Sequence, residues 1–124
     1  MKTLLMAVAV AGMLGSGAAM AMDGNELLEG CQAMIQTDDT GEAPPVNLII
    51  GAGQCLGIVE GVRMTMFYLN GSLPEAARVC FPKGVTTGQG ARVVVKYLKD
   101  NPEELHEDAT SLIFFAYHKA FPCK

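Results

Sequence analysis

The chain has 124 residues, of which 50% are hydrophobic, and a formal net charge of −4. A chain of this length forms one small domain with a single core. The acidic balance argues against nucleic acid as a partner, because binding a polyanion requires clustered basic residues.

The first 21 residues have the pattern of a secretory signal peptide. Lys2 precedes an apolar run from Leu4 to Leu14, and the small residues that end at Ala21 form an A-x-A cleavage site. Cleavage there leaves residues 22–124 as one domain with eight basic and thirteen acidic residues, a net charge of −5. We expect an exported protein with no membrane partner after cleavage.

A first helix is predicted from Asp23 to about Gln36. Asp23 and Glu26 have the spacing of a capping box, and apolar residues follow at helical intervals. The acidic, proline-bearing stretch Thr37–Pro45 is predicted to be the loop that follows this helix.

A long second helix is predicted from about Asn47 to Leu69, although four glycines lie inside it and each costs up to about 1 kcal/mol relative to alanine. One predicted face holds Gly51, Cys55, Ile58, Val62, Met66 and Leu69, and another holds Gly53, Gly57, Gly61, Met64 and Tyr68. The pattern predicts a central helix that packs on two sides. A membrane glycine zipper is the alternative, but charged residues within the helix argue against it.

Two further helices are predicted near the C-terminal end. The third spans about Thr87 to Lys99 and opens with the capping pattern of Thr86. The fourth spans Pro102 to about Phe121, with proline at its first position.

Four cysteines allow three pairings. Consecutive helices joined by short connections usually lie antiparallel, which favours Cys31 with Cys55 in the first hairpin and Cys80 with Cys123 at the base of the second. The predicted fold class is therefore all-α, a small bundle of four to five helices arranged as two antiparallel hairpins stapled by two disulfides.

The sequence offers no catalytic apparatus. His106 and His118 lie about 120° apart on one predicted helix and cannot share a metal ion. The serines of the mature chain, Ser72 and Ser111, lie outside any nucleophile elbow. The cysteine spacings match no zinc motif. We predict no enzyme activity, no metal and no cofactor.

Four stretches, taken together and in order, resemble the Rap/Tai family of immunity proteins that accompany type VI secretion amidase toxins. The resemblance covers residues 55–123. Its residues are Cys55-Leu-Gly57-Ile-Val-Glu-Gly61-Val62, Cys80-x-Pro82-x-Gly84-Val85-Thr86-x-Gly88-Gln89, Val93-Val-Val-Lys-Tyr97-Leu98-Lys-x-x-Pro102-Glu103-x-x-His106, and Ala116 with Ala120-Phe121-Pro122-Cys123.

The resemblance implies a periplasmic immunity protein that occludes the active site of a peptidoglycan amidase and so protects the cell from its own and its sister cells' toxin. Two other functions stay open, a periplasmic helical chaperone or stress protein and an inhibitor of endogenous cell-wall hydrolases. The sequence leaves open whether the chain forms a homodimer.

Three segments are candidates for contact with the toxin. They are the predicted loops Thr37–Pro45 and Asn70–Val79, and an outer strip of the long helix at i, i+3 and i+7. The candidate residues are Asp38, Asp39 and Glu42 in the first loop, Arg78 in the second, and Glu60, Arg63 and Phe67 in the strip.

Overall fold

The computed structural model describes residues 21–124, so the predicted signal peptide lies outside the described residues apart from Ala21. The described part is all-α, as predicted. Its four α-helices are α2 (Gly24–Thr40), α3 (Ile49–Leu69), α4 (Thr87–Asp100) and α5 (Ala109–Ala120). Short 3-10 turns lie between them: η1 (Val46–Leu48), η2 (Asn70–Ser72), η3 (Glu75–Ala77) and η4 (Pro102–Glu104).

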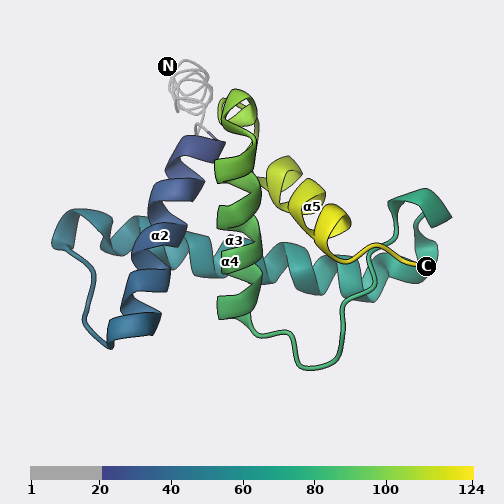
Figure 1. Ribbon diagram of the computed structural model, residues 1–124, viewed down its shortest axis with the longest axis horizontal. Coiled ribbons are helices and arrows are strands. Elements are labelled where there is room, and N and C mark those ends of the chain that lie inside the picture. The colour runs from purple at the N-terminus through teal and green to yellow at the C-terminus, as the bar shows by residue number, and fades with distance from the viewer. Residues whose placement is uncertain (1–20) are drawn as a thin grey trace, which may run out of the picture.

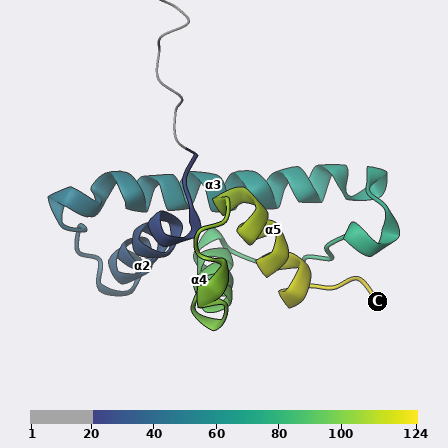
Figure 2. The same cartoon turned by 90° about the horizontal axis from the view of Figure 1, so that it is seen from above.

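The helices form two layers rather than two side-by-side hairpins. Figure 1 shows α3 running across the molecule while α2 and α4 cross it steeply. Seen from above in Figure 2, α2, α4 and α5 all lie on one side of α3. The expectation that α2 and α3 run antiparallel was therefore wrong, although four helices and both disulfides were predicted correctly.

The steep crossing of α2 and α3 depends on a contact between two glycines. A Cβ atom placed on Gly30 would lie 2.3 Å from the carbonyl oxygen of Gly51. Without side chains at this point the two backbones approach closely, and Cys31 and Cys55 follow at the same crossing with their Cα atoms 5.1 Å apart. The crossing angle is thus set by bare backbone contact, which a pattern of apolar residues does not reveal.

One hydrophobic core lies between the two layers. Leu27 and Cys31 of α2 and Val59 of α3 are fully buried in it. The other buried members come mainly from α4 and α5: Cys55, Met66, Val79, Ala91, Val94, Val95, Leu98, Ala109, Leu112, Ile113, Ala116 and Tyr117.

The first helix is longer than predicted. Its capping box at Asp23 and Glu26 is present, but the helix continues through Thr40, where Gly41 ends it with a left-handed φ of 72°. The hydroxyls of Thr37 and Thr40 donate hydrogen bonds to carbonyls four residues earlier, so these polar residues are satisfied within the helix. Residues 37–40 of the predicted loop are therefore helical.

The predicted fourth helix is broken near its start. Residues 102–104 form only the turn η4, and α5 begins at Ala109. Asp108 is the reason for the break, because its backbone is extended and its carboxylate accepts a hydrogen bond from the amide of Ser111 as an N-cap. The same residue forms an isolated bridge with Asp23, which ties the start of α5 to the start of α2.

One face of α3 is bare, contrary to the prediction that this helix packs on two sides. Gly53, Gly57 and Gly61 are exposed, and a Cβ atom on any of them would meet nothing within 4 Å. The segment Val46–Ser72 is long and apolar enough to cross a membrane, and 17% of its most apolar window is buried. One helix that passes a test of length and composition is weak evidence for a membrane span.

Both predicted disulfides are confirmed. Cys31 is bonded to Cys55, and Cys80 is bonded to Cys123. The first joins α2 to α3 inside the core, and the second joins the segment before α4 to the segment after α5. The two disulfides thus cross-link the chain at two separate places.

Candidate partner-binding surfaces

The C-terminal end of α3 presents three consecutive exposed apolar side chains. Phe67, Tyr68 and Leu69 are 58%, 74% and 51% exposed, and the rings of Phe67 and Tyr68 meet edge to face at 5.5 Å. Large apolar side chains that gather on a surface mark interaction sites more often than isolated ones do. We call these three residues the apolar end of α3.

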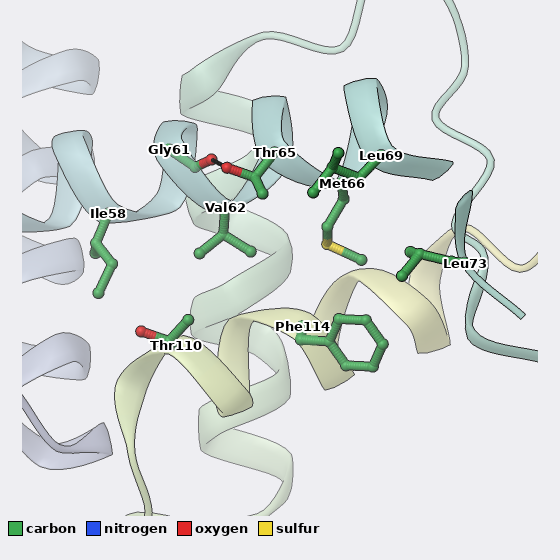
Figure 3. Close-up of a pocket in the computed structure, with 9 residues that line it drawn as sticks. All are labelled: Ile58, Gly61, Val62, Thr65, Met66, Leu69, Leu73, Thr110 and Phe114. Atoms are coloured by element: carbon green, nitrogen blue, oxygen red, sulfur yellow. Dashed lines mark hydrogen bonds between the residues drawn. The ribbon is translucent and has the colours of Figure 1, made fainter. Parts of the chain in front are cut away.

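A groove of about 440 Å³ adjoins the apolar end, between α3 and α5. Figure 3 shows Val62 and Met66 pointing from α3 toward α5, with Phe114 on the opposite wall. The hydroxyl of Thr65 donates to the carbonyl of Gly61, so the groove wall is chiefly apolar. The lining residues are Ile58, Gly61, Val62, Thr65, Met66, Leu69, Leu73, Thr110 and Phe114.

The segment Asn70–Val79 follows the apolar end and is held in place by side chains. The Asn70 carboxamide oxygen accepts from the Val79 amide at 3.0 Å, and Arg78 Nε donates to the Leu73 carbonyl at 3.0 Å. His118 Nε2 lies 2.7 Å from the Ala76 carbonyl and fastens the segment to α5. These contacts fix the predicted loop, and the Nε of Arg78, a predicted partner-binding residue, takes part in one of them.

A charged pair lies in the middle of α3. Arg63 donates two hydrogen bonds to Glu60, at 2.9 and 2.5 Å, and Thr87 of α4 donates to the same carboxylate at 3.0 Å. The hydrogen bond from Arg63 is the main cause that holds the pKa of Glu60 below its ordinary value, and partial burial opposes it. Glu60 therefore stays ionised and links α3 to the start of α4.

The acidic residues at the end of α2 are paired with a base from α4. Arg92 contacts Asp38 at 3.1 Å and also bonds Asp39, and its side chain is 40% exposed. These two carboxylates raise the pKa of Arg92, with Asp38 the larger cause. Negative charge at a helix C-terminus is unfavourable, so the guanidinium offsets that charge. Glu42 lies just beyond, exposed, with its amide donating to the Thr40 hydroxyl.

The fold brings two of the three predicted surfaces together. Thr87 reaches Glu60, and the next residue, Gly88, lies against Asp38, so the start of α4 joins the α3 pair to the α2 carboxylates. Arg78 lies apart from them, in the segment beyond the apolar end. Sequence reasoning assigned no joining role to Arg92 or Thr87, because their partners are 54 and 27 residues away and no local pattern marks them.

The two histidines do not form a catalytic pair. His106 lies before α5 rather than on it, and its exposed ring pairs with Glu107 at 3.3 Å. His118 stacks on Phe114 with a 16° angle between ring planes. Within residues 21–124 no group of three metal-ligating side chains converges, and every cysteine there is in a disulfide.

Comparison with known proteins identifies one family. The sequence model of the family described as "Rap1a immunity proteins" matches residues 23–123, nearly the whole described chain. No curated protein matches at the significance required, and no solved structure does either.

Proposed function

Because the chain belongs to the Rap1a immunity protein family, we propose that it neutralises a peptidoglycan amidase delivered by type VI secretion. Membership implies immunity against a cognate toxin, and an immunity protein of this family is not an enzyme. The proposal adds the toxin's chemistry and the way in which it is blocked, which is occupation of its active-site cleft.

The apolar end of α3 is the observation that best supports this proposal. It exposes two aromatic rings, and its third member, Leu69, lines the groove between α3 and α5. Aromatic side chains are common energetic centres of protein interfaces. Phe67 was predicted as a contact residue and is the most exposed member of its strip. Glu60 and Arg63 are occupied with each other, so we assign them a role in positioning this face.

A rigid surface suits inhibition by occlusion. A partner that is already ordered loses little conformational freedom on binding, so more of the contact energy appears as affinity. Here the Cys80–Cys123 disulfide and the hydrogen bonds made by the side chains of Asn70 and Arg78 hold the segment next to the apolar end. We propose that this segment and the apolar end together enter the toxin's cleft.

The acidic end of α2 is the second proposed contact. Asp38, Asp39 and Glu42 are exposed, and the first two are only partly neutralised by the single guanidinium of Arg92. A toxin with a basic rim would associate faster with such a surface, and the effect would weaken as salt is added.

The proposed place of action is the periplasm. Two disulfides and the family assignment are consistent with export, because disulfides persist in oxidising compartments. An amidase acts on the wall in that space, so the inhibitor must reach it as well.

The test is a binding titration against the amidase co-expressed with this chain. We expect Phe67→Ala to weaken binding about tenfold or more, equivalent to about 1.4 kcal/mol. Ile50→Ala is the matched control, because Ile50 is 74% exposed at the far end of the same helix. Equal affinity of both variants and the parent would remove the apolar end from the proposed interface.

A second pair of variants tests the acidic surface. Reversing charge at Asp38 and Asp39 should weaken binding at low salt, whereas Arg92→Ala breaks the same ion pairs without adding positive charge. A loss shared equally by both would indicate a structural effect. Exporting the amidase with and without this chain tests the function itself, and lysis that the chain does not prevent would refute it.

A further inference from the structure

The two disulfides differ sharply in exposure. Cys31 and Cys55 are both 0% exposed and belong to the core. Cys80 is exposed and Cys123 is half-buried, and neither belongs to the core. A thiolate must reach a sulfur atom to attack it, so access alone separates the two bonds.

The accessible bond fastens the tail of the chain to the segment before α4. The Cys80 amide donates to the Phe121 carbonyl at 2.9 Å, and Val79 and Pro122 form an isolated antiparallel bridge. The amide of Val79 also donates a hydrogen bond to the side-chain oxygen of Asn70. The disulfide is therefore one of the ties that order the segment after α3.

We propose that Cys80–Cys123 is a thiol–disulfide exchange site for dithiol reductants, and that its reduction loosens residues 70–80 and 121–124 without unfolding the helices. One thiolate of the dithiol attacks Cys80, the more exposed half-cystine, and Cys123 leaves as a thiolate. The second thiol of the reagent then displaces Cys80. The dithiol is oxidised to a disulfide, and its two electrons and two protons reside on the two cysteines.

The remaining contacts explain why the effect stays local. Phe81, which lies outside the loosened residues, meets the buried Tyr117 of α5 with ring centroids 5.1 Å apart. The core disulfide still joins α2 to α3 after the exchange. The helices therefore keep both their apolar contacts and one covalent link. This behaviour is independent of what the toxin is.

The test uses the mature oxidised protein under native conditions. It is incubated with increasing dithiothreitol, blocked with an alkylating reagent, and mapped by peptide mass spectrometry. We expect label at Cys80 and Cys123 at least about tenfold sooner than at Cys31 and Cys55, because a buried bond is reduced only when the structure opens. Simultaneous labelling of all four, or labelling of the core pair first, overturns the proposal.

Hydrogen exchange tests whether loss of the Cys80–Cys123 bond loosens only the two segments, in a variant that cannot form that bond. In Cys80→Ser/Cys123→Ser, exchange should quicken about tenfold in residues 70–80 and 121–124 and stay unchanged in α3 and α4. Cys31→Ser/Cys55→Ser is the control, in which the loss should spread through α2 and α3. Unchanged exchange at the tail, or faster exchange in all helices of the first variant, contradicts the inference.

Discussion

Replacing Gly30 with alanine should destabilise the protein, although alanine is the better helix former. Inside a helix the exchange alone favours alanine by up to about 1 kcal/mol. The new Cβ atom would, however, lie 2.3 Å from the carbonyl oxygen of Gly51, and a backbone atom cannot swing away as a side chain can. Overpacking costs typically reach about 1–3 kcal/mol. We expect a net loss of about 1–2 kcal/mol.

The size of the effect can be measured by thermal unfolding followed by circular dichroism. For a domain of about 100 residues, the expected loss lowers Tm by about 4–16 °C. Gly57→Ala is the matched control on the bare face of α3, where a Cβ atom meets nothing within 4 Å. That variant should gain up to about 1 kcal/mol. A stabilised Gly30→Ala, or a destabilised Gly57→Ala, would refute the arrangement of α2 on α3.

Substitutions at three further positions test single side chains. Glu60→Gln should lower urea resistance at pH 7, and the deficit should shrink below the ordinary carboxyl pKa of 4.5, because Arg63 lowers the folded-state pKa and its stabilisation is lost as protons bind. Asp108→Ala should cost about 1 kcal/mol by removing the cap on Ser111, and Asp108→Asn should restore most of it in the same denaturant titration. Burial is the largest cause that raises the pKa of Tyr97 from 10.0 to about 12. The neutral phenol of Tyr97 therefore contributes its full stabilisation of the folded state below pH 10, and this contribution is lost as the pH rises through 12. In unfolding curves measured from pH 9 to 12, Tyr97→Phe should lack that loss.

Local signals in the sequence predicted most of the helices. The caps at Asp23 and Thr86 are present, and each marks a helix start within a residue. The cysteine pairing was also correct, although the expected antiparallel packing of α2 on α3 was not. Cys31 and Cys55 meet because their helices cross at the glycine contact beside them. A steep crossing of α2 and α3 thus allows the same disulfide that antiparallel packing would allow.

The errors arose where distant residues decide the local structure. Asp108 is an ordinary acidic residue in a helical pattern until its backbone bridges Asp23, 85 positions away, and becomes a cap. Thr40 reads as part of a loop until its hydroxyl bonds back into the helix. Partner-binding residues are harder still to predict from the sequence, because the side chains that make contact depend on the surface of the partner, which lies outside this chain.

The bare face of α3 follows from where the other helices pack. A helix of 21 residues is about 32 Å long, and α2, α4 and α5 all lie on one side of it, so no helix of residues 21–124 covers the other side. The periodicity identified two faces with low polarity but could not say which one the other helices would cover. The uncovered face runs from Ile50 at one end to Tyr68 at the other, both 74% exposed. The Tyr68 end adjoins the apolar groove and the fixed segment after α3, whereas Ile50 lines a pocket of about 300 Å³ that includes Glu26, Glu29 and Gln54. A partner that buries apolar side chains therefore has reason to bind at the Tyr68 end. Comparing Phe67→Ala with Ile50→Ala distinguishes binding at the Tyr68 end from non-specific hydrophobic binding along the whole bare face. Non-specific binding would reduce the affinity of both variants equally.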